Sequence, residues 1–222
     1  MKRRDALLGA LAAVAAGGYF VANRSGAAPT GLLVSPAQAD DAAEIDTAQI
    51  VEMVQGAEDA PVTIIEYASF TCPHCATFHQ GAYQQIKKNY IDTGKVRLIY
   101  REVYFDRYGL WASMVARCGG PEKFFGITDL IFKGQAEWVQ AGDGSAIVGE
   151  LRKIGRLAGL DEATLDACLQ DGEKAQTLVA WYQKNAEADD IQGTPSFVVN
   201  GRKVPNQSYA DFAALIDAEL GS

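Results

Sequence analysis

The sequence predicts an α/β protein in which a βαβ half and a ββα half are separated by a block of helices. Three observations lead to this prediction. An apolar strand pattern over residues 62–69 runs directly into a helix pattern that contains two cysteines. A second strand pattern, residues 96–103, follows that helix, so the two strands are expected to be parallel. After a long helical stretch, a hairpin pattern around Asn200-Gly201 returns the chain to β structure.

The first 39 residues have the composition of an export signal. A basic cluster at residues 2–4 precedes an uncharged run over residues 6–22, and Ala37-Gln38-Ala39 has the form of a cleavage site. Arg3-Arg4 also resembles a twin-arginine signal, so the twin-arginine and the general secretory routes both stay open. An uncleaved membrane anchor is the alternative, although the uncharged run would be a short span.

The charge balance narrows the classes of partner. The chain holds 28 acidic and 20 basic residues, a formal net charge of −8, and loss of the basic leader would make it more negative. Nucleic acid and anionic membrane surfaces are therefore poor partners for it. With 48% hydrophobic residues, the chain can bury a sizeable core.

The elements are expected in the following order. A short leading strand covers residues 50–54, and the 62–69 strand is followed by one helix over residues 73–92, which Gly94 ends. Apolar residues then recur at helical spacing, and the chain finishes with two short strands and a last helix. The helical stretches are residues 110–118, 123–132, 146–158, 163–169 and 174–185; the closing elements are 195–199, 202–204 and 209–220.

We divide the chain accordingly into five parts. They are an export signal or anchor at 1–39, a tether and leading segment at 40–58, a first sheet half at 59–108, an inserted helical domain at 109–188 and a second sheet half at 189–222. The acidic run at 187–190 is expected to be a solvated helix end. We expect the folded chain to be a monomer.

Cys72 and Cys75 lie where the first strand meets its helix. Pro73 suits the first helical turn because the amide hydrogen it lacks would have no partner there, and this places Cys72 at or near the N-cap. The free amides and the helix dipole at that position favour a thiolate. Cys72 is the predicted nucleophile and Cys75 the predicted resolving thiol. His74 can donate a hydrogen bond, or a charge when protonated, towards the Cys72 sulfur.

Four cysteines in an exported chain allow up to two disulfides. The close spacing pairs Cys72 with Cys75 as an exchangeable bridge, which leaves Cys118 and Cys168. A bridge between these two would close a loop of about 50 residues and contribute ~4 kcal/mol. The alternative is that Cys118 and Cys168 are separate buried side chains.

At this point the chain resembles the DsbA-type thiol-disulfide oxidoreductases of the thioredoxin superfamily over residues 59–220. The likeness is carried by Cys72-Pro73-His74-Cys75 after a strand and by Gly193-Thr194-Pro195 before a β-hairpin. Arg101-Glu102-Val103 and Ala116-Arg117-Cys118 are similar to the members with a helical insertion. The resemblance implies a thioredoxin fold with an inserted helical domain, acting as a periplasmic dithiol oxidase without a cofactor or a resident metal.

The resemblance also implies roles for three residues. Glu66 matches the buried acid beneath the active site, where a raised pKa would let it exchange a proton with Cys75; from the residues alone, a solvent-facing Glu66 is as good an alternative. Pro195 matches a cis proline that places the Thr194 backbone beside Cys72 to pair with an extended substrate. Without the resemblance, a trans Thr194–Pro195 turn is the expectation.

Thr194 leaves the direction of exchange open. The best-known DsbA oxidases carry valine before this proline, whereas threonine is found in related isomerases and in several other DsbA-like proteins. The leading hypothesis is donation of the Cys72–Cys75 disulfide to reduced secreted proteins, with reoxidation by a DsbB-like membrane partner. The same fold acting as a reductase or isomerase is the alternative.

A third hypothesis belongs to another class, a metal-binding protein using Cys72, Cys75 and His79. These three soft or borderline ligands have spacings that suit zinc or copper. No second ligand cluster follows them, and Pro-His between the cysteines suits redox chemistry better. We therefore expect His79 to be a helix-surface or groove residue.

Overall fold

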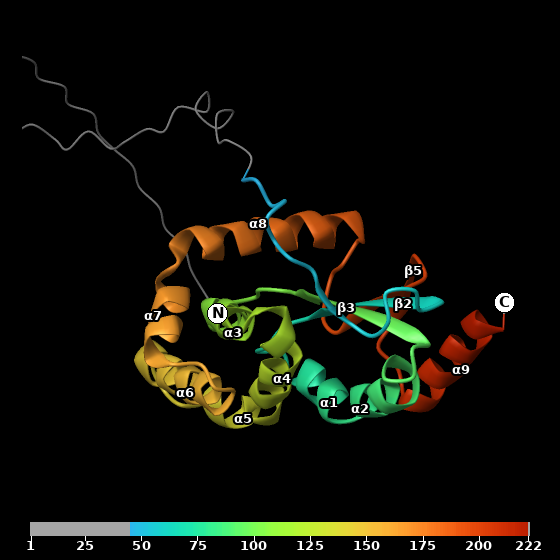
Figure 1. The fold of residues 1–222 in the computed structure, drawn as a ribbon, viewed down its shortest axis with the longest axis horizontal. Coiled ribbons are helices and arrows are strands. Elements are labelled where there is room, and N and C mark those ends of the chain that lie inside the picture. The colour runs from blue at the N-terminus through green and yellow to red at the C-terminus, as the bar shows by residue number, and fades with distance from the viewer. Residues whose placement is uncertain (1–44, 222) are drawn as a thin grey trace, which may run out of the picture. The chain divides into compact units, whose positions relative to one another are not determined.

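The computed structural model describes residues 45–221, so the export signal expected at 1–39 and the start of the tether lie outside the described residues. A sheet of five strands in the order β1-β3-β2-β4-β5 runs through this part of the chain (Figure 1). The strands are β1 Met53–Gln55, β2 Val62–Ala68, β3 Val96–Glu102, β4 Ser196–Val199 and β5 Arg202–Pro205.

The two central strands pair in parallel, as predicted. Val62 of β2 lies opposite Val96 of β3, and β4 then joins β2 antiparallel. The hairpin to β5 completes one edge, and β1 lies antiparallel to β3 at the other. β1 begins three residues later than expected because the buried Ile50 packs against helix side chains, among them Leu178 and Trp181.

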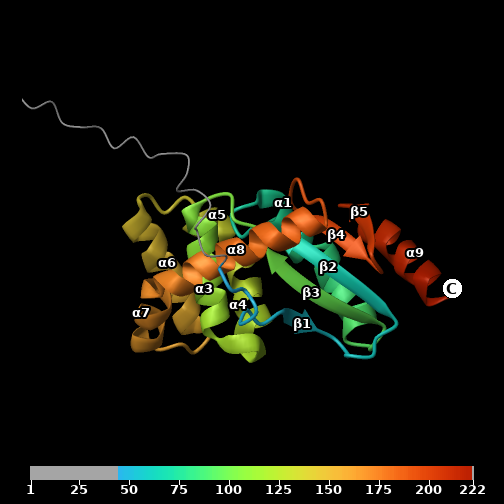
Figure 2. The ribbon, with the colours of Figure 1, turned by 90° about the horizontal axis from the view of Figure 1, so that it is seen from above.

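Side chains of β2 alternate between two helical layers, since successive residues of a strand point to opposite faces. Val62 and Ile64 pack with α1 (Pro73–Gln80), α2 (Ala82–Ile86), the π-helix η2 (Lys87–Ile91) and α9 (Tyr209–Leu220). Tyr67 packs on the opposite face, where Tyr182 of α8 (Gly172–Ala188) adjoins the same cluster. Figure 1 shows α8 on one side of the sheet and α1, α2 and α9 on the other, and in Figure 2 α8 crosses in front of the strands.

The single helix expected over residues 73–92 is wrong, because the chain breaks it twice. Gly81 adopts φ −122° and ψ −94°, outside the helical region, and its amide bonds the carbonyl of Phe78. From Lys87 the helix continues in the wider π geometry. Breaks at glycine and at π segments are common causes of helix bending. The break lets Phe78 of α1 and Ile86 of α2 both reach the apolar layer on the sheet.

A block of helices fills the sequence between β3 and β4. Each stretch predicted from helical spacing corresponds to one helix: α3 Arg107–Cys118, α4 Gly120–Lys133, α6 Gly144–Leu157, α7 Glu162–Gln170 and α8. The four-residue α5 (Gln135–Trp138) is not predicted, since one turn is too short to show a period. The boundaries proposed for an inserted domain stay a prediction. No helix within residues 45–221 is both long and apolar enough to cross a membrane.

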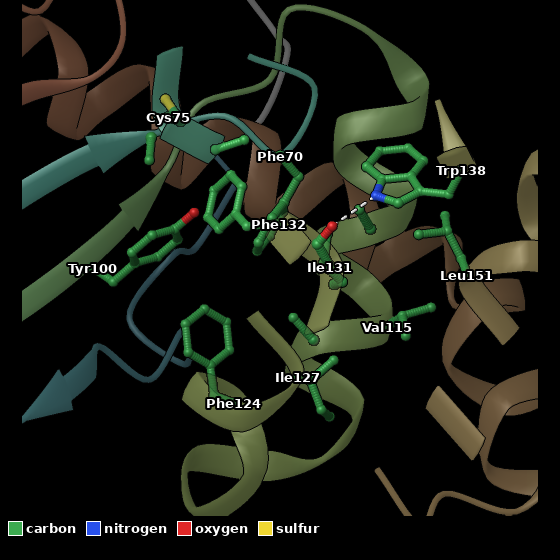
Figure 3. Close-up of a cluster of buried hydrophobic side chains, with 14 of the residues drawn as sticks. Phe70, Cys75, Tyr100, Val115, Phe124, Ile127, Ile131, Phe132, Trp138 and Leu151 are labelled. Atoms are coloured by element: carbon green, nitrogen blue, oxygen red, sulfur yellow. Dashed lines mark hydrogen bonds between the residues drawn. The ribbon is translucent and has the colours of Figure 1, made fainter. Parts of the chain in front are cut away.

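The helices share one apolar core with the end of the sheet. Phe70 and Tyr100 pack against Phe132, Ile131 and Trp138, and the Trp138 indole donates to the Ile131 carbonyl at 2.9 Å (Figure 3). The Cys75 side chain belongs to the same cluster and is fully buried. The resolving cysteine expected from the sequence therefore sits inside the core, where water is excluded.

Candidate active site

Cys72 occupies the N-cap of α1, and Pro73 is in the first turn, the arrangement that the sequence predicts. The turn from β2 is held by the Cys72 amide, which donates to the Ser69 carbonyl at 3.1 Å. No side chain caps the helix start. The backbone amides of the first turn are thus available to the sulfur of Cys72.

A second support for this turn comes from Gln135 of α5, which the sequence analysis missed. Its buried side-chain amide donates to the carbonyls of Phe70 and Cys72, at 2.7 and 2.9 Å. One glutamine thereby satisfies two carbonyls at the junction between strand and helix. No local pattern could have revealed it, because the contact joins residues more than 60 positions apart.

The two cysteines are free thiols with opposite acid-base properties. The pKa of Cys72 is lowered to about 5, first by a hydrogen bond from the Cys75 thiol, then by the Thr194 side chain and by the backbone amides of Cys75 and His74. The pKa of Cys75 is raised, mainly by burial and next by its hydrogen bond to Cys72. One sulfur is thus ready to react as a thiolate, and the other is held as a thiol.

Thr194 faces this pair from the loop before β4. The Thr194–Pro195 peptide bond is cis, and the Cys72 sulfur lies 3.4 Å from the Thr194 carbonyl oxygen. The Thr194 hydroxyl is buried and makes no hydrogen bond within residues 45–221, but it lies near both sulfurs and lowers the pKa of both cysteines because it can donate to a thiolate. Pairing of β4 with β2 brings this loop to the cysteines from more than 100 residues away.

Glu66 lies beneath α1, and its side chain is fully buried. It has the same parity along β2 as Val62 and Ile64, so it points to the same layer. Its Oε1 is 2.9 Å from Nε2 of His79, and its charge contributes to the raised pKa of Cys75. The alternative of a solvent-facing Glu66 is wrong.

His79 is not the helix-surface residue that one of the two expectations describes, because its side chain is only 1% exposed, although the residue lines a pocket as the other expectation allows. The residue four positions after Cys75 lies on the same helix face, which here is the buried one. That spacing was a signal that could have predicted the burial. The ring stacks on Phe132 with centroids 4.2 Å apart.

His74 contributes through its backbone. Its side chain is exposed, and its amide is one of the groups that lower the pKa of Cys72. The amide contribution agrees with the expected effect of the helix start, and the role expected of the imidazole stays a prediction.

Cys118 and Cys168 form a disulfide that joins α3 to α7, with Cα atoms 5.8 Å apart and 50 residues between them in sequence. The alternative of two separate thiols is therefore wrong. This bridge lies within the helical block, on elements that pack together through Val115 and Leu165.

The acidic run at 187–190 is only partly solvated. Asp189 accepts a hydrogen bond from Tyr67 at 2.5 Å and one from Arg101 at 3.2 Å, which tie the end of α8 to β2 and β3. Glu187 and Asp190 are exposed, as expected. No local pattern could predict the contacts of Asp189, because its partners lie on distant strands.

The trio Cys72, Cys75 and His79 is not arranged as a metal site. No group of three His, Cys, Asp or Glu side chains in the described part of the chain could hold a metal ion. His79 is instead bonded to Glu66.

Comparison with known families adds to this geometry. A family model described as thioredoxin matches residues 48–218, most of the chain. The chain belongs to the thioredoxin family. Within it the chain is DsbA-like, as the resemblance indicated, and the predicted thioredoxin fold with a helical insertion is confirmed.

Among the relatives of this DsbA-like chain, a Rickettsia bellii protein provisionally named a protein-disulfide oxidoreductase is 35% identical over 170 residues, 76% of this chain and 64% of that protein. Disulfide bond formation protein D of Bacillus subtilis is 27% identical over 179 residues, 75% of this chain and 76% of that protein. Wolbachia pipientis alpha-DsbA1 superposes with a TM-score of 0.70 at 28% identity, covering 77% of this chain and 91% of that chain. The chain spans less than two thirds of the length of the Rickettsia relatives.

Proposed function

We propose that this chain is a periplasmic thiol-disulfide oxidoreductase that donates the Cys72–Cys75 disulfide to reduced exported proteins. The observation that carries the proposal is the contrast between the two sulfurs. The pKa of Cys72 is lowered to about 5, whereas burial raises that of Cys75. Stabilising the Cys72 thiolate stabilises the reduced form, so the disulfide becomes more oxidising. The names of the relatives agree with exchange between thiols and disulfides.

Exchange proceeds in two displacements. A substrate thiolate attacks the Cys72 sulfur, the Cys72–Cys75 bond breaks, and Cys75 leaves as a thiolate that takes up a proton. A second substrate thiolate then attacks the substrate sulfur of the mixed disulfide, and Cys72 leaves as a thiolate. The substrate loses two electrons and gains a disulfide, while this chain becomes the dithiol. A sulfur of low pKa is the better leaving group, so the second displacement is favoured.

The remaining site residues assist these steps. The Thr194 backbone, 3.4 Å from the Cys72 sulfur, is placed to pair with an extended substrate strand, next to Pro195. Glu66 is the acid that exchanges a proton with Cys75, because it is buried beneath α1 and its charge acts on that thiol.

The direction of thiol-disulfide exchange distinguishes the proposed oxidase from the alternative, a reductase or isomerase. The Thr194 hydroxyl lowers the pKa of Cys72, and this stabilises the dithiol and favours oxidation of substrates. We expect equilibration with glutathione to give a potential well above that of thioredoxin. A value near or below about −270 mV would favour the reductase.

The proposal also includes a reoxidising partner and an export route. An oxidase of this kind needs a partner that removes two electrons from its dithiol, and we expect a DsbB-like membrane protein to do so while the chain itself is monomeric. Export would follow either the twin-arginine or the general secretory route. Fractionation of cells expressing the full chain, in strains lacking one route, would distinguish the two.

The direct test uses a dithiol peptide and the oxidised protein. We expect one disulfide donated per chain, monitored by the loss of peptide thiols. The Cys72→Ser variant should donate none. Failure of the wild-type protein to oxidise the peptide, or full activity of the variant, would rule out the proposal.

A further inference from the structure

A buried pair lies behind the reactive cysteines. The side chains of Glu66 and His79 are 0% and 1% exposed, and one contact of 2.9 Å joins them. Glu66 Oε2 and His79 Nδ1 have no hydrogen-bond partner within residues 45–221. Burying such groups with half of their polar atoms unpaired is costly, and an unpaired buried atom calls for an explanation. Exchange at the Cys72 sulfur does not require His79.

On its other side His79 adjoins a pocket. This cavity of about 380 Å³ is lined by His79, Gln80, Gln84, Asp129, Phe132 and Lys133. Its volume admits several water molecules, and its amide, carboxylate and ammonium groups can hold them. His79 thus takes part both in the contact with a carboxylate inside the core and in the lining of a polar pocket formed by α1, α2 and α4.

The two tyrosines around the pair do not compete for its proton. The pKa values of Tyr83 and Tyr100 are raised, first by burial and also by negative charges that include Glu66, so both phenols stay protonated. Burial also raises the pKa of Asp129, and a positive charge on His79 would lower it. The charged and titratable groups near His79 are Glu66 from β2, Tyr83 from α2, Tyr100 from β3, and Asp129 and Lys133 from α4. Lys87 from η2 acts on Asp129.

We propose that His79 is a positioning residue that relays a proton between Glu66 and water in this pocket, so that Cys75 can change its protonation state inside the core. This proposal rests on the proposed exchange at Cys72 and Cys75. When a substrate thiolate opens the disulfide, Cys75 leaves as a thiolate. The Glu66–His79 pair gives that sulfur one proton and regains one from water through the imidazole. When the disulfide reforms, the proton follows the reverse path, and no further oxidant or reductant is needed.

The His79→Gln variant separates the relay from a structural role. Glutamine keeps an N–H that can donate to Glu66 but has no titratable nitrogen. In single-turnover reaction of the oxidised protein with a dithiol peptide, we expect the rate to fall by about tenfold, at the lower end of what a positioned acid contributes. The pH profile of that rate should lose one step, while the pKa of Cys72 stays near that of the wild type.

Lys184→Gln is the control, because this exposed lysine lies on α8, on the other side of the sheet from His79, and it should keep the wild-type rate and pH profile. A His79→Gln variant with the wild-type rate and pH profile would overturn the relay. If that variant does not fold, a protein that keeps His79 still provides a test. The chain has only two histidines, so His74→Gln leaves one imidazole signal to follow by nitrogen NMR.

We expect the His79 imidazole to titrate differently in the disulfide and dithiol forms, because its proton is exchanged with the Cys75 sulfur. Identical titration in both forms, or no titration at all, would contradict the relay. These outcomes differ from failure of the proposed function. In that case the wild-type protein would donate no disulfide to the peptide, whatever its histidine does.

Discussion

The chain holds two cysteine pairs whose surroundings differ in every respect that controls reactivity. Cys72 and Cys75 are three positions apart at the start of a helix, and the first is half-buried with a pKa lowered to about 5. Cys118 and Cys168 are 50 positions apart and already joined across two packed helices. Closing a loop of a few residues contributes little to stability, whereas closing one of about 50 contributes ~4 kcal/mol. The first pair is suited to exchange and the second to holding the fold.

The comparison shows that position, more than cysteine itself, decides the role. Helix-start amides, the Cys75 thiol and the Thr194 hydroxyl all stabilise a thiolate at position 72. Such a set of donors at a half-exposed sulfur is the environment that makes a cysteine reactive.

The largest expected effect is on disulfide donation, which should depend on Cys72 but not on the Cys118–Cys168 pair. Cys72→Ser should abolish disulfide donation to a dithiol peptide, because no other sulfur can form the mixed disulfide. The double variant Cys118→Ala/Cys168→Ala should keep activity at a temperature where it is folded. Peptide thiol loss measures both. Equal loss in the two variants would show that the second pair is not merely structural.

For stability we expect the opposite ranking, with the Cys118–Cys168 pair mattering more than the Cys72–Cys75 pair. Cys118→Ala/Cys168→Ala should lower the free energy of unfolding by ~4 kcal/mol, since the unfolded chain regains the freedom of a long loop. Reducing Cys72–Cys75 should not destabilise the protein. Urea unfolding provides both values. The first comes from the wild type compared with the double variant, and the second from the double variant with Cys72–Cys75 oxidised and reduced. A double variant as stable as the wild type would contradict the structural role.

Gln135 tests how firmly the reactive turn is held. Gln135→Leu removes a donor to the carbonyls of Phe70 and Cys72. The Cys72 carbonyl keeps the Ala76 amide, so loss of the partner of the Phe70 carbonyl should cost about 1–3 kcal/mol of unfolding free energy. Urea unfolding measures the loss. The exposed Gln192→Leu serves as a surface control and should change little. Equal values for both variants would mean that the turn does not depend on α5.

The smallest expected effect concerns Thr194. Thr194→Val removes a hydroxyl that can donate to the Cys72 thiolate, and the loss of this donor to a charged group should raise the pKa of Cys72 by about one unit. Thr128→Val is the matched control, because Thr128 also has a buried hydroxyl without a partner within residues 45–221, but in α4. The pH dependence of thiol alkylation reports the pKa. A shift in both variants, or in neither, would remove the proposed role of Thr194.

Much of this fold could be predicted from the sequence because short-range patterns of residues determine its elements. The strand at 62–68, the N-cap position of Cys72 and the last helix at Tyr209–Leu220 follow from apolar spacing, Pro73 and capping residues. The parallel pairing of β2 with β3 follows from the helix between them.

What the sequence could not supply depends on contacts between distant segments. The break at Gly81 and the single turn of α5 leave no periodic trace. The contacts of Gln135 with Cys72 and of Asp189 with Tyr67 join residues that only the folded chain brings together. The burial of His79 was within reach, since its spacing from Cys75 places both on one helix face.

The central claim is that the helix start holds Cys72 as a thiolate. The most direct test is a pH titration of the reduced protein in which the ultraviolet absorbance of the Cys72 thiolate is monitored. We predict a midpoint near 5. Between that value and the ordinary thiol pKa of about 8.5, the unfolded chain binds more protons than the folded chain, so the stability of the reduced protein should rise with pH over this range and fall as pH drops through about 5. A midpoint near 8.5, with a stability of the reduced form that does not change between these values, would contradict the account.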